Sequence, residues 1–142
     1  MFDGIKARWL EALRSGKYPQ VREKLHGSGG GFCCLGVLCD LHRISQEKKV
    51  TGWVALDYPE NVKSDGNNMA YLGETNYLPR AVMDWAGIAV TDCGGSGCDP
   101  NVALPDGSLH SLSSLNDGEY SMQEGPMDFN EIADLIENME DM

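Results

Sequence analysis

The chain has 142 residues, enough to bury a hydrophobic core without disulfides or a metal ion, and we expect a single domain over residues 1–142. No segment approaches the roughly 20 consecutive apolar residues that cross a bilayer, and Met1 leads into a charged segment rather than a signal peptide. These features predict a protein of the cytoplasm that enters no membrane, and the formal net charge of −11 disfavours binding to duplex nucleic acid.

The charge is divided unevenly along the chain. Residues 1–50 hold nine Lys and Arg residues against five Asp and Glu residues, a balance of +4, whereas residues 51–142 hold two against 17, a balance of −15. The first third can therefore form a local anion site. The acidic remainder could bind a basic protein partner or could itself mimic nucleic acid. A solvated acidic surface that only maintains solubility explains the same charge.

The N-terminal residues predict an amphipathic helix. Asp3 is placed to cap it, and Ser15-Gly16 ends it. Trp9 falls on the apolar face and is expected in the core. The apolar positions of this helix, at spacings of three and four, are Phe2, Ile5, Trp9, Ala12 and Leu13.

The segment 27–41, GSGGGFCCLGVLCDL, combines a glycine run with the likeliest core helix, because its second part is apolar on nearly every face. Gly36 inside this helix destabilises it by about 1 kcal/mol relative to Ala, and its presence predicts that another element passes close to the helix there. Gly29, Gly30 and Gly31 form either a tight turn or, with the start of the helix behind them, a cradle of backbone N–H groups for an anion.

The rest of the chain alternates short strands, turns and helices. Strands are expected at 53–58 and 69–73, a helix between Pro79 and Gly87, a flexible loop at 91–100, a hairpin around 105–107 and a turn at 115–118. Asp128 and Glu131 form a capping-box pattern ahead of a last amphipathic helix. The fold class predicted is α+β, with about four helices on a small antiparallel sheet of about four strands.

Five cysteines in a chain without a signal peptide favour reduced thiols, so no structural disulfide is expected. Cys93 and Cys98 could pair or bind zinc with the Cys33, Cys34 and Cys39 group, but adjacent cysteines in an apolar helix do not match zinc-site spacing. We expect no metal and no cofactor. A thiol nucleophile assisted by His110 and Asp117 is also disfavoured, because cysteines in so apolar a run usually pack inertly.

Neither a nucleoside-triphosphatase loop nor a dinucleotide-binding fingerprint is present, so the glycine run predicts binding rather than catalysis. Basic residues just ahead of it would grip phosphate, and Tyr18, Trp53 and Tyr58 are candidate rings for stacking a base. Asn116 and Asp117 could contact the polar edges of such a ligand. The predicted binding residues, with no catalytic residue among them, are Arg14, Lys17, Arg22, Lys24, Gly29, Gly30, Gly31, Asn116 and Asp117.

Five segments resemble a family of small, largely uncharacterised proteins of tailed bacteriophages and prophages: WLEALRSGKYPQ, FCCLGVLCDL, LPRAVMDWAG, SLND and FNEIADLIE. They occur in the same order over nearly the whole chain, and CCLGVLCD is the specific motif. The CGGSGC loop around Cys93 and Cys98 departs from the pattern. The resemblance implies a viral origin and action on host components, without catalytic residues to carry over.

The leading hypothesis from the sequence is a non-enzymatic counter-defence protein that sequesters a nucleotide-derived immune signal in the host bacterial cytoplasm, as a homo-oligomer. The alternative is an acidic inhibitor of a host protein, with nucleic-acid mimicry as one mode. A third hypothesis is an enzyme that cleaves the nucleotide signal.

Overall fold

The computed structural model describes residues 1–27, 29–46, 52–55, 68–88, 91–94, 97–118 and 127–139. In chain order the elements are α1 (Asp3–Arg14), β1 (His26–Gly27), α2 (Cys34–Ser45), β2 (Val54–Ala55), β3 (Asn68–Ala70), α3 (Arg80–Ala86), β4 (Thr91–Gly94), β5 (Gly97–Ala103), β6 (Leu109–Ser111), α4 (Leu112–Asp117) and α5 (Phe129–Glu137). Among the described residues, no helix is long and apolar enough to cross a membrane.

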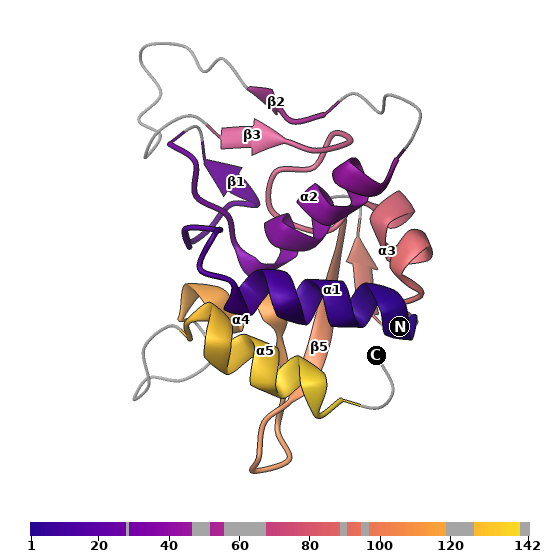
Figure 1. Cartoon of the computed structure of the whole chain (residues 1–142). Coiled ribbons are helices and arrows are strands. Elements are labelled where there is room, and N and C mark those ends of the chain that lie inside the picture. The colour runs from indigo at the N-terminus through magenta and orange to yellow at the C-terminus, as the bar shows by residue number, and fades with distance from the viewer. Residues whose placement is uncertain are drawn as a thin grey trace.

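The predicted α+β class is confirmed. Two three-stranded antiparallel sheets form, with strand orders β1-β3-β2 and β4-β5-β6. The helix α1 crosses the middle of the molecule between α2 on one side and α5 on the other (Figure 1). The five helices of the described residues all contribute to one cluster of buried side chains. In this cluster α2 is apolar on nearly every face, as its sequence predicts.

Several predicted elements are confirmed, although the strand predicted at 69–73 is shorter than expected: β3 ends at Ala70, and Leu72 and Gly73 lie in a turn. Val54 pairs with Ala70 across β2 and β3, and Asn101 pairs with Ser111 across the β5–β6 hairpin. Pro79 precedes α3, and Gly87 ends it in the left-handed conformation. Between the two predicted strands the sequence also predicts a polar loop at 59–68, of which residues 59–67 lie outside the described residues. The part of the first predicted strand beyond Ala55 lies outside them too.

Two predicted irregular segments are instead regular, so those predictions are wrong. The expected loop 91–100 contains β4 and the start of β5. Leu78, which lies outside this segment, exchanges two backbone hydrogen bonds with Cys98, of 2.9 and 2.8 Å, and so anchors the glycine-rich segment. The expected turn 115–118 is the end of α4. Ser111 caps this short helix through its side chain, and Gly118 ends it.

The start of α1 also differs from the prediction. Phe2 occupies the N-cap position and Asp3 is the first helical residue, and no side chain caps the helix. The backbone N–H of Phe2 instead donates to Ala86 O at 2.9 Å, at the end of α3. Trp9 lies in the core as predicted, with no exposed surface, and its indole N–H donates to Cys34 O at 3.0 Å.

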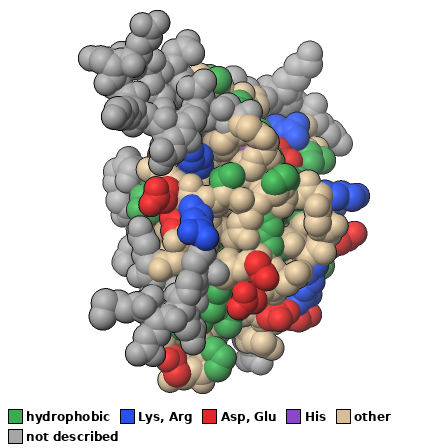
Figure 2. All heavy atoms as spheres, turned by 90° about the vertical axis from the view of Figure 1, so that its left-hand side faces the viewer, with side chains coloured by type: hydrophobic (Ala, Val, Ile, Leu, Met, Phe, Trp, Pro, Cys, Tyr) green, Lys and Arg blue, Asp and Glu red, His purple; other side chains and the backbone are tan. Residues whose placement is uncertain are grey.

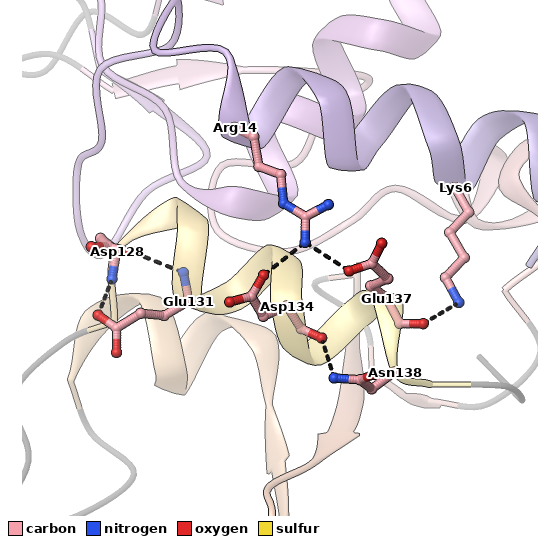
Figure 3. A network of polar contacts seen from close by, with 7 residues as sticks. All are labelled: Lys6, Arg14, Asp128, Glu131, Asp134, Glu137 and Asn138. Carbon is pink, nitrogen blue, oxygen red and sulfur yellow. Dashed lines mark hydrogen bonds and ion pairs between the residues drawn. The ribbon is translucent and has the colours of Figure 1, made fainter.

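Polar contacts join the two terminal helices (Figure 3). Arg14 bonds the carboxylates of Asp134 and Glu137 at 2.7 and 2.9 Å, and Lys6 donates to two carbonyl groups at the end of α5. A cation there also complements the helix dipole. The predicted capping box is present: Asp128 accepts from the N–H of Glu131, whose side chain accepts from the N–H of Asp128.

The close approach predicted at Gly36 is confirmed. A Cβ on Gly36 would lie 1.8 Å from the carbonyl oxygen of Leu25, which accepts a hydrogen bond from Cys33 N at 3.1 Å. Gly31 is crowded in the same way, since its Cβ would lie 2.0 Å from Val21 Cγ1. The segment that precedes β1 is therefore pressed directly onto the first turn of α2.

Replacing Gly36 with Ala should destabilise the protein by roughly 3 kcal/mol, because the new methyl group must displace backbone rather than a mobile side chain. Urea denaturation followed by circular dichroism measures this. Gly4→Ala is the matched control, since Gly4 also lies in a helix and its added Cβ would meet nothing within 4 Å; a gain of up to about 1 kcal/mol is expected there. Equal stability of the two variants would contradict the assigned crowding.

Candidate functional site

Residues 20–25, here called the strap, lie between the start of α2 and the end of α4. Backbone bonds hold the strap at both ends: Val21 N donates to Phe32 O at 2.9 Å, and Leu25 N donates to Thr75 O at 2.7 Å. The spacing of Val21 and Leu25 allows one short turn of helix, whereas the strap contains no helix. Its side chains therefore depend on tertiary contacts for their positions.

Asn116 supplies the central contact. Its side chain is fully buried, and its Oδ1 accepts from Cys34 N at 3.2 Å and from Gln20 Nε2 at 2.9 Å. Its Nδ2 donates to Val21 O at 2.8 Å and to Asp117 Oδ1 at 3.0 Å. An amide has two acceptor positions and two donors, so these four bonds use its whole capacity. Asn116 therefore joins the strap, α2 and α4. It has no donor or acceptor left for the direct ligand contact that the sequence predicts.

Asp117 continues this arrangement towards the surface. Its Oδ1 also accepts from the backbone N–H of Glu23 at 2.8 Å. Glu23 has a φ of +62°, in the left-handed region that residues with a Cβ rarely adopt. Such a conformation persists only where surrounding contacts fix it, and it concentrates at functional sites. The bond from Asp117 is one such contact.

A polar cleft of about 270 Å³ opens beside the strap. Three carboxylates line it, those of Glu23, Asp99 and Asp117, and we call it the acidic cleft. The strap, the loop after β3, β5 and α4 all contribute to its wall. The remaining lining residues are Asn76, Tyr77, Ser113 and Ser114.

Asp99 is the most enclosed of the three carboxylates. Ser113 donates to it twice, from its backbone N–H to Oδ1 at 3.2 Å and from its hydroxyl to Oδ2 at 2.5 Å. Burial raises the pKa of Asp99 above its ordinary value, and the bonds from Ser113 oppose that rise. The carboxylate is thus held in one orientation, and a cation entering the cleft would favour its charged form.

A second cavity of about 240 Å³ is lined by Gln20, Arg22, Met127 and Asp128. Arg22 therefore borders one cavity while the next residue, Glu23, borders the acidic cleft. Of the nine predicted binding residues, Arg22 and Asp117 line a cavity, one in each.

The predicted basic residues are not gathered at one place. Arg14 points to α5, where it bonds Asp134 and Glu137. Lys17 is exposed, and Lys24 lies along Gly27, whose added Cβ would be 3.5 Å from Lys24 Cδ. On the face that includes the left-hand side of Figure 1, Lys and Arg side chains alternate with Asp and Glu side chains (Figure 2). No continuous basic patch is visible on that face.

The glycine run forms the tight turn, the first of the two alternatives. Gly30 N donates to Gly27 O at 3.0 Å, and Gly27 N donates to Gly31 O at 2.9 Å, with Gly30 at a φ of +100°. Gly29 and Gly30 are exposed, whereas Gly31 is buried. The start of α2 offers no open anion cradle, because Cys33 Sγ accepts from Gly36 N and Asn116 Oδ1 accepts from Cys34 N.

The chain matches the family described as a domain of unknown function, DUF8296, over residues 1–140. It belongs to this family. The match includes every described residue of both cavities. Comparison with curated proteins and with solved structures found no match. The resemblance to bacteriophage proteins stays a prediction.

The cysteines of this family member divide into two groups. Cys33, Cys34 and Cys39 are buried free thiols, and burial raises the pKa of each, that of Cys33 to about 12. Such thiols are poor nucleophiles. Cys98 is disulfide-bonded, which contradicts the expectation of no disulfide, and the strand register places Cys93 opposite it. No group of His, Cys, Asp or Glu within the described ranges could hold a metal ion.

The predicted stacking rings have internal partners. Tyr18 donates its hydroxyl to Asp40 Oδ2 at 2.7 Å, and Trp53 donates its indole N–H to Asp40 Oδ1 at 3.0 Å. Arg43 also bonds Asp40, so this buried carboxylate holds the two rings near the end of the strap. Tyr58 lies outside the described residues.

Sequence reasoning missed most of the acidic cleft. The sequence predicts a flexible loop at Asp99 and makes no structural prediction for Ser113 and Ser114. The Ser-Leu-Asn-Asp segment 114–117 was the one useful signal, because it supplies Ser114 and Asp117 together with the buried Asn116 between strap and helix. Asn76 and Tyr77 follow β3 in a segment without any local motif.

Replacing Asn116 with Ala should lower the free energy of unfolding by roughly 3 kcal/mol, because it removes the side-chain partner of the buried N–H of Cys34 and of the carbonyl of Val21. Thermal and urea denaturation measure the loss. Asn138→Ala is the control, since Asn138 makes an exposed bond to Asp134 O at 2.9 Å and its loss should cost under about 1 kcal/mol. If the two variants lose the same free energy of unfolding, the buried hydrogen bonds of Asn116 stabilise the protein no more than one exposed bond does, which would contradict the prediction.

Proposed function

We propose that the protein acts by binding rather than by catalysis, as an acidic inhibitor whose cleft receives a basic group of a host protein. The observation that carries the proposal is the convergence of Glu23, Asp99 and Asp117 around one cavity. An ionised carboxylate accepts hydrogen bonds and cannot donate them, so a ligand here must supply hydrogen-bond donors and preferably positive charge.

The size of the acidic cleft supports a side chain as its occupant. Pockets for complete small-molecule ligands usually measure about 300–1,000 Å³. At about 270 Å³ the cleft falls just below that range, while the second cavity, at about 240 Å³, is also below it. A Lys or Arg side chain from a partner fits the acidic cleft, whereas a complete nucleotide would have to extend beyond it.

Electrostatics favour the same partner. A phosphate in the acidic cleft would face three carboxylates, and like charges at such separations cost free energy. The formal net charge of −11 instead attracts a basic protein surface over longer range and speeds its association.

The absence of an activated nucleophile in the candidate site supports binding over catalysis. Within the acidic cleft, the described lining residues include no histidine and no cysteine. Ser113 donates its hydroxyl to the carboxylate of Asp99 and not to an imidazole, the base that usually activates a serine nucleophile. The resemblance to bacteriophage proteins directs the proposal to a protein of the host bacterial cytoplasm.

A second candidate function is sequestration of a nucleotide-derived immune signal, as the sequence predicted. Arg22 and Gln20 favour it, because they line a cavity where a phosphate could meet a guanidinium group. The homo-oligomer predicted together with this function is also a proposal, which light scattering would test.

The acidic-inhibitor proposal predicts that a Glu23→Lys variant loses its host partner. Tagged protein incubated with bacterial lysate should retain a stoichiometric partner at low salt and release it as salt rises, because the attraction is screened. Asp84→Lys is the control, since Asp84 is exposed on α3 and the charge change is equal. If both variants retain the partner equally, the cleft does not bind it.

The nucleotide proposal predicts binding of a cyclic or linear nucleotide signal in calorimetry, with at least a tenfold loss of affinity in Arg22→Glu and little loss in Arg8→Glu. Arg8 is exposed on α1 and lines neither cavity. Denaturing the loaded protein and recovering the nucleotide intact would separate storage from cleavage, the third hypothesis. No binding across the signal panel would reject this candidate.

A further inference from the structure

Cys98 is disulfide-bonded, unlike Cys33, Cys34 and Cys39, which are buried free thiols. The backbone shows how this bond contributes to the fold. Leu78 N donates to Cys98 O at 2.9 Å, and Cys98 N donates to Leu78 O at 2.8 Å. Both backbone groups of Cys98 therefore face Leu78 and are not available to β4.

The register of β4 and β5 suits a disulfide at this position. It places Cys93 opposite Cys98, and because the backbone groups of Cys98 bond Leu78, the two cysteines form a non-hydrogen-bonded pair. In such pairs the Cα atoms lie about 4.5 Å apart, a separation that a disulfide spans without distortion. At Cys98, the link between β4 and β5 is made by the side chain and not by the backbone.

Within the described residues, hydrogen bonding between β4 and β5 is sparse. Hydrogen-bonded and non-hydrogen-bonded pairs alternate along antiparallel strands, so the bonds to β4 fall to Gly97 and Asp99. Pro100, opposite Thr91, has no N–H to donate. A strand pair this short is marginal by itself, so a covalent link has a large share in keeping β4 attached.

Asp99 connects this strand pair to the acidic cleft. Its backbone lies in the pair with β4, while its side chain lines the cleft and accepts from Ser113 N at 3.2 Å. Tyr77, which precedes Leu78 in the chain, lines the same cleft. Release of β4 would leave β5 anchored at Leu78 but would free the backbone of Asp99 from its partner strand.

We propose that the disulfide of Cys98 is a redox switch, whose reduction releases β4 from β5 and loosens Asp99 at the wall of the acidic cleft. The switch does not require that the cleft bind a partner. Cys98 is 2% exposed, so the thiol that reduction leaves there is shielded, and the consequence of reduction is structural rather than catalytic.

The reductant is a dithiol. One of its thiolates attacks a sulfur of the disulfide, which forms a mixed disulfide and displaces the other sulfur as a thiolate that takes up a proton. The second thiol of the reductant then breaks the mixed disulfide and closes the reductant's own disulfide. The protein gains two electrons and two protons and holds two thiols, and oxidised glutathione reverses the exchange.

The test compares the ¹⁵N-labelled full chain after oxidised glutathione and after dithiothreitol, with hydrogen exchange of single amides measured by NMR. Titration of the denatured protein should find three thiols before reduction and five after it. We expect exchange at Gly97 and Asp99, whose amides bond β4, to become about tenfold faster or more. The amide of Cys98, which bonds Leu78, is the internal control and should change much less. A shift of the Ser113 amide reports the change at the cleft.

Two variants locate the effect. Cys93→Ser should show fast exchange at Gly97 and Asp99 without dithiothreitol and no response to it, because the register predicts Cys93 as the partner of Cys98. Cys39→Ala removes a buried free thiol and should keep the full response. The spectrum of each variant also reports whether it is folded.

Four results would overturn the switch. A disulfide that dithiothreitol leaves intact at neutral pH is a permanent structural bond. Unchanged exchange at Gly97 and Asp99 after reduction would mean that β4 stays attached without it. Equally faster exchange at these amides and at Ile132 of α5 would mean that the bond stabilises the whole fold rather than one strand pair. A response to dithiothreitol that persists in Cys93→Ser would place the disulfide elsewhere.

Discussion

The contact of Leu25 with Gly36 is the constraint on which the candidate site depends. The carbonyl oxygen of Leu25 occupies the space where any other residue at position 36 would place its Cβ, and it accepts a hydrogen bond from Cys33 N at 3.1 Å. Only a glycine lets the backbone lie so close to a helix. The strap ends at this contact, so the placement of Arg22 and Glu23 follows from it. Gly36 weakens α2 locally, but it allows the strap to lie against the helix and so determines where the strap residues lie on the surface.

Asn116 completes this constraint with polar contacts. Gly36 gives the strap room, but shape alone would leave the carbonyl of Val21 and the N–H of Cys34 without partners in a buried region. Asn116 satisfies both and also orients Asp117, whose carboxylate holds Glu23 in its unusual conformation. A buried network that is fully satisfied favours one arrangement over its alternatives. The same side chains that stabilise the fold thus set the geometry of the acidic cleft.

Local patterns predicted much of the fold and little of the candidate site. The periodicity of α1 and α5, the capping box at Asp128 and the crowding at Gly36 are each encoded within a few residues, and the structure confirms them. The acidic cleft combines the strap with residues from 76 to 117, which no local pattern links. The glycine-rich segment 91–100 was misjudged for a related reason. Its strand is anchored by Leu78, outside the segment.

The basic first third of the chain illustrates why charge in sequence does not predict charge in a site. Arg14 bonds two carboxylates of α5, more than 100 positions later, and Arg43 bonds the buried Asp40. Both arginines are exposed but paired with carboxylates of the protein itself, whereas Glu23, Asp99 and Asp117 line a cavity. Arg14, which the sequence predicts as a ligand-binding residue, instead joins the two terminal helices. The acidic cleft combines Glu23 of the basic first third with Asp99 and Asp117 of the acidic remainder. The carboxylates that line the acidic cleft are acceptors, and for this reason we propose a donor-rich ligand there.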